Sequence, residues 1–276
     1  MFGGFNAPRQ RIALRAGAFF AEIWPELGGA VACFERHRPL GLRSAVQALF
    51  RSTRAQPSYL PTDLACFPLL PYSRIADGCV QIGGSANELP GNFAGSDLHG
   101  VGWIRPWFVQ EQHSDRCSLC LIHDRDADWP CAFTAVQEIV LTESGLELRL
   151  DLINSGERAM PYGIGHHPYV RRPAGTRIFA PVEGLSGDVH VAWPDGSGLR
   201  ISCSPALPFL VVHSVPERDF VCLEPVSQRP NAFNAAAGDQ RAAGVAMLEP
   251  CQSTRLVQRF DYLPAPSYFR GSTNAR

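Results

Sequence analysis

Four stretches of the sequence place polar side chains where a buried strand would hold apolar ones. The stretches are FPLLPYSRI (67–75), LHGVGWIRPW (98–107), MPYGIGHHPYV (160–170) and CLEPVSQRPNAF (222–233). Their candidate residues are Arg74, His99, the pair His166 and His167, and Glu224. Histidine and glutamate can exchange protons with a substrate near neutral pH, whereas arginine can bind oxygen atoms. Taken singly, each also fits a structural role, as a core histidine, a solvated carboxylate or a surface arginine.

The two adjacent histidines cannot both serve one site if they lie in a strand. Successive side chains of a strand point to opposite faces of the sheet. We therefore expect one of His166 and His167 to face a ligand and the other to pack or to form a hydrogen bond behind it.

Strand signals dominate the rest of the chain. Short β-rich runs bounded by Gly, Pro, Asn, Asp or Ser occur at 11–25, 29–36, 78–84, 117–124, 132–156, 199–204, 208–215, 219–226 and 253–263. The run at 132–156 contains the clearest hairpin, two alternating arms around TESG. Helical spacing occurs only at 41–57, where Val46, Leu49 and Phe50 could form one face before Pro57.

Strands that follow strands without intervening helices disfavour a parallel sheet and favour antiparallel sheets packed face to face. We therefore predict an all-β protein, one large antiparallel β-sandwich with few short helices. The prolines and glycines are spread between strands, so we predict a single domain over 1–264 and a disordered tail over 265–276.

Composition excludes several classes of function. The 276 residues carry a formal net charge of −1, which gives no electrostatic basis for binding nucleic acid or an anionic membrane. All 25 basic residues are arginine, so Schiff-base chemistry and a P-loop lysine are excluded. The nine cysteines follow no metal or disulfide pattern, and we interpret the CxxC at Cys117 and Cys120 as buried small side chains. With no run resembling a signal peptide or membrane helix, we expect a cytoplasmic location.

Together the motifs resemble the aldose 1-epimerase family, also called galactose mutarotases. The strings FPLLPYSRI, LHGVGWIRPW, DADWPCAF, MPYGIGHHPYV and CLEPVSQRPNAFN occur in the order found in that family, and the resemblance runs from about Gly17 to Tyr262. It implies a large β-sandwich with a sugar in an open cleft, a small-molecule hexose as partner, no cofactor and no metal. We expect a monomer or a homodimer.

The resemblance also implies roles for individual residues. His167 corresponds to the general acid and Glu224 to the general base. His99 and Arg74 correspond to residues that bind sugar hydroxyls, and Trp103 is a candidate surface for stacking on the sugar ring.

Anomer interconversion requires these residue types. A base takes the proton of the C1 hydroxyl while an acid protonates the ring oxygen, the open chain rotates about C1–C2, and the ring recloses. A bell-shaped pH–rate profile is expected, with the acidic limb assigned to Glu224 and the basic limb to His167.

The sequence departs from the family in two places. Ser73 stands before Arg74, where the family has asparagine. The segment after Tyr169 is several tens of residues short and lacks an alignable sugar-binding aspartate; Asp188 and Asp195 occur there but match no family string.

Three alternatives remain open on the sequence. A noncatalytic sugar-binding protein would keep the cleft without turnover. A hexose-6-phosphate 1-epimerase would need arginines at the site, and candidates near the motifs are Arg105, Arg171, Arg172 and Arg229. A glycosidase would need two carboxylates around the scissile bond, and Glu224 alone is placed at the site by the motifs.

Overall fold

A computed structural model describes residues 10–40, 43–51, 63–76, 78–82, 85–92, 97–181, 188–236 and 238–266. The tail predicted over 265–276 lies outside these residues from 267 onwards, so its disorder stays a prediction. The same holds for the single-domain boundary at 264.

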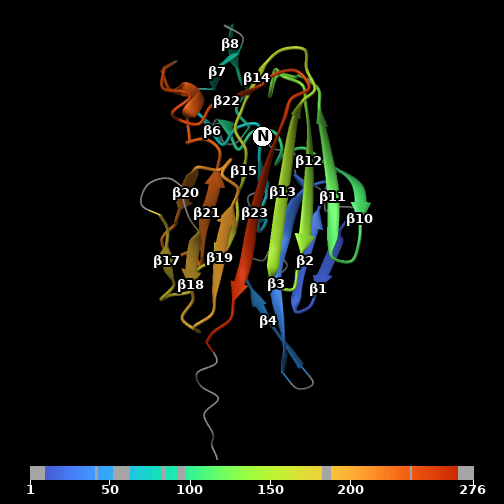
Figure 1. The fold of residues 1–276 in the computed structure, drawn as a ribbon, viewed down its shortest axis with the longest axis vertical. Helices are drawn as coiled ribbons and strands as arrows, with labels where there is room; N and C mark the ends of the chain where they lie inside the picture. The colour runs from blue at the N-terminus through green and yellow to red at the C-terminus, as the bar shows by residue number, and fades with distance from the viewer. Residues whose placement is uncertain are drawn as a thin grey trace, which may run out of the picture.

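The largest element is an antiparallel sheet of eight strands (Figure 1). In spatial order the strands are β10 (Phe108–Gln112), β11 (Arg116–His123), β12 (Phe133–Leu141), β13 (Gly145–Asn154), β23 (Ser253–Leu263), β19 (Gly198–Cys203), β18 (Val189–Ala192) and β17 (Arg177–Phe179). The predicted hairpin forms β12 and β13, in register from Phe133–Asn154 to Leu141–Leu146. Buried and partly exposed side chains alternate along β12, so one face of the sheet covers the core.

Two smaller antiparallel sheets form the second layer. The four-stranded sheet contains β1 (Ile12–Ala16), β2 (Phe19–Trp24), β3 (Ala30–Leu40) and β4 (Arg43–Ala48). The five-stranded sheet contains β16 (Tyr169–Arg171), β21 (Phe220–Val226), β15 (Gly165–His166), β5 (Pro68–Leu69) and β20 (Phe209–His213), which pairs with β21. Isolated bridges between Val31 and Cys66 and between Phe50 and Val170 join the two sheets.

The main apolar core lies between the two layers. Phe50, two residues after β4, meets Phe260 of β23 edge to face, with ring centroids 5.0 Å apart, and Phe34 of β3 meets Phe50 at 5.2 Å. Leucines of β13 and the inward residues Val170 and Val221 belong to the same cluster. The predicted all-β sandwich is confirmed.

Short elements connect the layers. They are the strand pairs β14 (Met160–Tyr162) with β22 (Ala246–Leu248), β6 (Arg74–Ile75) with β9 (Asp97–Leu98) and β7 (Cys79–Ile82) with β8 (Ser85–Glu88), and the 3-10 helix η2 (Ala232–Asn234). Within the ranges that the structure describes, no helix is long and apolar enough to cross a membrane. Cys117 and Cys120 are buried free thiols of β11, as the sequence indicated.

The helix predicted over 41–57 is wrong where the structure describes that segment. Arg43–Ala48 is strand β4, paired with β3 from His37–Val46 to Glu35–Ala48. Leu49 and Phe50 are buried, whereas Val46 is 56% exposed, so the three residues do not share one face. Pairing with the long strand β3 overrides the helical spacing, because a short apolar run fits either period. Residues 52–57 lie outside the described part.

Candidate active site

His167 lies directly across the sheet from Glu224. On either side of this position, β21 pairs Val226 with Gly165 and Cys222 with Tyr169, and this register puts His167 opposite Glu224. On the other side of the histidine, the His167 amide donates to the Phe67 carbonyl at 2.9 Å. Directly opposed side chains of a sheet point to the same face, so the two candidates meet although 57 positions separate them in the chain.

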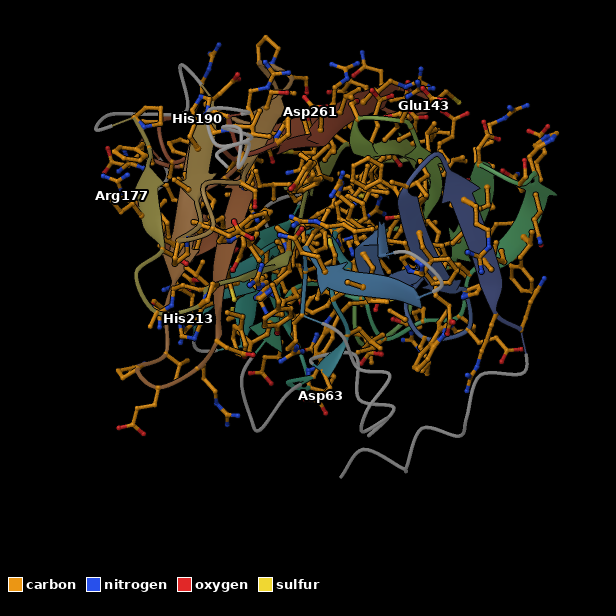
Figure 2. The ribbon with its side chains drawn as sticks, turned by 90° about the horizontal axis from the view of Figure 1, so that it is seen from below. Asp63, Glu143, Arg177, His190, His213 and Asp261 are labelled. Carbon is orange, nitrogen blue, oxygen red and sulfur yellow. The ribbon has the colours of Figure 1, made fainter. Side chains whose placement is uncertain are left out.

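The imidazole and the carboxylate are in direct contact. His167 Nε2 lies 3.2 Å from Glu224 Oε1, and the two residues are only 6% and 3% exposed. They belong to the outer face of the five-stranded sheet, away from the main core. His213 of β20 is paired with Cys222 and so shares the face of Glu224. In Figure 2 His213 lies on one side of the molecule, and Asp261 of β23 and Glu143 in the turn after β12 lie on the other.

Burial favours the uncharged form of both Glu224 and His167. It raises the pKa of the Glu224 carboxyl to about 8. It lowers the pKa of His167 well below its usual range, and the nearby His99, His213 and Arg51 lower that pKa further. A carboxyl and an imidazole that are both driven toward neutrality can share a single proton across their contact, and the directions of the two pKa shifts favour Glu224 as its holder.

Aromatic rings surround the imidazole. Phe67 stacks on His167 with ring centroids 4.8 Å apart at 19°, and the Tyr169 ring lies 4.6 Å from the imidazole and 6.2 Å from Phe67. Tyr169 therefore shares the face of His167, as expected from strand alternation. Arg51 lies over the Tyr169 ring at 4.0 Å and donates to the Leu64 carbonyl.

His99 and Arg74 lie beside the pair. The His99 ring is 4.9 Å from that of His167, edge to face, and its Nδ1 is buried without a hydrogen-bond partner. Burial lowers the pKa of His99 to about 4, and the charge of Arg74 acts in the same direction. The Arg74 side chain is exposed at the start of β6. A neutral histidine with a free nitrogen can bind a hydroxyl group as donor or acceptor.

The predicted stacking role of Trp103 is not supported. Its side chain is 1% exposed and packs on Phe67 with centroids 5.4 Å apart, so no ring face is open to a sugar. Its indole N–H donates to the carbonyls of Leu98 and Gly100. Trp103 thus holds the loop that carries His99.

Gly100 gives this loop its shape, and its replacement should destabilise the protein. Gly100 has φ +68°, and a Cβ there would lie 1.9 Å from the Leu70 carbonyl oxygen. We expect Gly100→Ala to lower the free energy of unfolding by about 2–4 kcal/mol, from left-handed strain and overpacking. Gly238→Ala is the matched control, because a Cβ there meets nothing within 4 Å. Equal denaturation midpoints for the two variants would contradict this account.

His166 points the other way, into the main core. It is fully buried, and its two ring nitrogens lie 2.8 Å from Gln258 Oε1 and 2.9 Å from Gln137 Oε1. Both glutamines belong to the large sheet, on β23 and β12. The structure therefore assigns the two histidines to opposite faces, with a hydrogen bond behind the site as expected.

A third side chain adjoins the pair. Cys222 is two residues before Glu224 on the same face, and possible ligand atoms of Cys222, His167 and Glu224 all lie within 4.8 Å of one another. Such a set could contact one metal ion. Burial raises the pKa of the Cys222 thiol to about 12, and the nearby Glu224 carboxylate acts in the same direction. The absence of a metal from the reaction stays a prediction.

The aspartates of the shortened segment lie elsewhere. Asp195 accepts hydrogen bonds from the amide and hydroxyl of Ser197, and Asp188 pairs with Arg200 of β19. Ser73 is 5% exposed, and its carbonyl accepts a hydrogen bond from the His99 amide at 2.6 Å. Ser73 thus supports the histidine through its backbone.

Sequence reasoning missed three neighbours of the pair: Phe67, Cys222 and Arg51. Cys222 could have been found, because it is two positions from Glu224 in a strand and must share its face. Phe67 and Arg51 come from other elements, and no local pattern indicates their contacts.

Comparison with known proteins places this geometry in a family. A family model described as aldose 1-epimerase matches residues 16–181, more than half of the chain. The chain belongs to the aldose 1-epimerase family. The matched range contains Arg74, His99 and His167, whereas Glu224 lies beyond it and is joined to them by the fold.

The chain is also similar to relatives of known sequence or structure. The uncharacterized protein YphB of Escherichia coli K12 is 33% identical over 130 residues, which are 46% of this chain and 44% of YphB. The chain thus matches less than half the length of this curated relative. A crystal structure from Escherichia coli K12, described as a candidate aldose 1-epimerase, superposes on this chain with a TM-score of 0.80 at 21% sequence identity. The superposition covers 92% of this chain and 98% of the other. A galactose mutarotase-like protein from Clostridium acetobutylicum has a TM-score of 0.70 at 16% identity, covering 91% and 94%. These structures share the fold.

Proposed function

We propose that the protein is an aldose 1-epimerase that interconverts the α- and β-anomers of a free hexose, with His167 and Glu224 as its acid–base pair. The observation that carries the proposal is the contact between these two side chains. They are buried, 3.2 Å apart, and brought together by strand pairing from distant parts of the chain. An ion pair that only stabilises the surface of a protein would be exposed to solvent, whereas this contact is buried.

The reaction needs one proton acceptor and one proton donor on the same anomeric carbon. The family resemblance assigns the acceptor role to Glu224, so the shared proton has to pass to His167 when the sugar enters. The direct contact gives that proton a path. The carboxylate then accepts the C1 hydroxyl proton, the imidazolium protonates the ring oxygen, and the C1–O5 bond breaks; reclosure on the other face of the aldehyde restores both groups.

The side chains beside the pair support sugar binding. His99 offers a neutral ring with an unpartnered nitrogen, and Arg74 offers an exposed guanidinium next to it. We propose that both bind hydroxyl groups of the hexose. Phe67 and Tyr169 exclude water from the imidazole and so strengthen its electrostatic interactions.

The phosphorylated-hexose alternative finds less support. Arg105 pairs with Asp126 and Asp128, and Arg172 donates to Ser214 and to backbone carbonyls. Arg171 lies over Trp193 and Arg229 over Phe209. Each of the four arginines suggested by the sequence thus has another contact, and they do not converge on His167.

Polarimetry tests the proposal directly. Freshly dissolved α-D-glucose and α-D-galactose should reach anomeric equilibrium faster with the protein than in buffer alone, in proportion to protein concentration. A noncatalytic sugar-binding protein would leave the buffer rate unchanged. Glucose 6-phosphate serves as the comparison substrate, and a clear preference for it would overturn the choice of free hexose.

The rate should have a bell-shaped pH dependence. The sequence alone assigned the acidic limb to Glu224 and the basic limb to His167, and the pKa shifts in the structure exchange these two assignments. The active pair holds one proton. Below the lowered pKa of His167, under pH 6.5, the pair gains a second proton and loses its base. Above about pH 8, the raised pKa of Glu224, the pair loses its only proton and has no acid. We expect an optimum between these limits, measured after subtraction of the buffer rate. A rate still rising above pH 9 would contradict this ordering.

A further inference from the structure

A chain of hydrogen bonds crosses the core immediately behind the candidate pair. Its members in order are the Gly29 carbonyl, Gln137, His166, Gln258 and the Pro225 carbonyl. The three side chains are at most 1% exposed. The proposed reaction does not use any of them, so the polarity of these buried side chains needs its own explanation.

The two ends fix the direction of the chain. Gln137 Nε2 donates to the Gly29 carbonyl at 2.7 Å, and Gln258 Nε2 donates to the Pro225 carbonyl at 2.8 Å. A carbonyl oxygen can only accept, so turning either amide would set two oxygens against each other. Both glutamines therefore present their Oε1 atoms to the centre of the chain.

His166 at the centre has to donate in both directions. Its Nδ1 faces one amide oxygen at 2.8 Å and its Nε2 faces the other at 2.9 Å. A neutral imidazole carries one N–H and would leave a lone pair against an oxygen in a dry core. Burial lowers the pKa of His166 to about 4 in spite of the opposing hydrogen bond to Gln258, and that value by itself would leave the ring neutral at pH 7. The second proton follows from the geometry instead: the Gln137 oxygen also faces a ring nitrogen, at 2.9 Å, and a neutral ring would leave one of the two oxygens without a donor.

The chain is attached next to both members of the pair. His166 directly precedes His167, and Pro225 directly follows Glu224. The two glutamines come from β12 and β23 of the large sheet, with β13 between them. The residue before His167 and the backbone after Glu224 are thus both hydrogen-bonded to the large sheet. The two carbonyls at the ends of the chain fix which atom of each group donates and which accepts.

We propose that His166 is a positioning residue, held as a double hydrogen-bond donor by Gln137 and Gln258, and that this chain sets the placement of His167 against Glu224. The kinetic part of this proposal rests on the proposed epimerase function. The protonation of His166 does not.

Two substitutions of Gln258 test the kinetic part. Gln258→Met removes both hydrogen bonds at nearly constant volume and should lower kcat by about tenfold or more, with KM little changed, because misplacement by about 1 Å is costly. Gln258→Glu keeps an oxygen acceptor for His166 but sets a carboxylate oxygen against the Pro225 carbonyl, so its kcat should lie between those of wild type and Gln258→Met. Leu256→Ala, a core truncation on the same strand, controls for lost stability and should leave kcat within about twofold. A loss in Gln258→Met no larger than in Leu256→Ala would overturn the positioning role.

Nitrogen-15 NMR of histidine-labelled protein at pH 7 tests the double donor without any assay of activity. Wild type should show protons on both ring nitrogens of His166, and Gln258→Met should reduce them to one. A single protonated nitrogen in wild type would overturn the proposal. If wild type shows both protons but no hexose is epimerised, the proposed function fails while the double donor holds.

Discussion

Replacing Glu224 by glutamine should reduce the epimerisation rate by about 10²–10⁴-fold while the fold stays intact. Glutamine has nearly the shape of glutamate and can still contact His167, but it cannot take a proton from the C1 hydroxyl. Glu224 is 3% exposed and contacts His167, and glutamine fills the same buried space, so the substitution should leave the packing of the sheet unchanged. The rate is measured by polarimetry at the optimum of the wild-type profile.

The same variant has a signature in stability that separates lost chemistry from damage. The folded carboxyl has its pKa raised to about 8, so between about pH 4.5 and pH 8 it holds a proton that the unfolded chain has released. Wild-type stability due to this group therefore falls as the pH rises through that window. Glutamine does not titrate, so the melting temperature of Glu224→Gln relative to wild type should be higher at pH 8 than at pH 4.5.

Glu143→Gln is the matched control for Glu224→Gln. Glu143 is exposed in the turn between β12 and β13, on the opposite side of the molecule from His213 (Figure 2). Its substitution should change neither the rate nor the pH dependence of the melting temperature. Normal activity in Glu224→Gln would remove Glu224 from the proposed mechanism.

Replacing His167 by asparagine should have an effect of similar size, about 10²–10⁴-fold on the rate. Asparagine can still form hydrogen bonds, but it cannot donate a proton to the ring oxygen and then recover it. The variant also loses the stack on Phe67, so some loss of stability is expected. His190→Asn, in the exposed part of β18, controls for the loss of a histidine and should be fully active.

The double variant Glu224→Gln/His167→Asn distinguishes a working pair from two independent groups. Residues that act as a unit lose most of their effect with the first substitution, so the double variant should be about as slow as the slower single variant. If the two rate losses multiply instead, the groups act separately, and the proton shared across the 3.2 Å contact is not part of the mechanism.

Much of the fold could be predicted because strand periodicity is a local property. The alternation along 132–156 predicted the hairpin of β12 and β13, and adjacency in a strand predicted that His166 and His167 face opposite sides. The helix prediction was wrong for 43–48 because pairing with β3 decides the conformation of this segment, and no local pattern shows that pairing.

The site divides in the same way. Residue types and motif order were sufficient to name His167, Glu224, His99 and Arg74 and to relate them to a family. The placement of His167 against Glu224 depends on the register of β21, which pairs segments more than fifty residues apart, and only the tertiary structure contains that register.

The protonation of the site was also decided by tertiary structure. An isolated glutamate is a stronger acid than an isolated histidinium, so sequence reasoning gave Glu224 the acidic limb. Burial among Phe67, Tyr169 and their neighbours disfavours both charges and reverses the order. Burial likewise removed Trp103 from contact with a sugar. The sequence by itself determined which groups can carry protons and that the chain folds as sheets; desolvation and strand register, which depend on the whole fold, decided how those groups meet and where the proton rests.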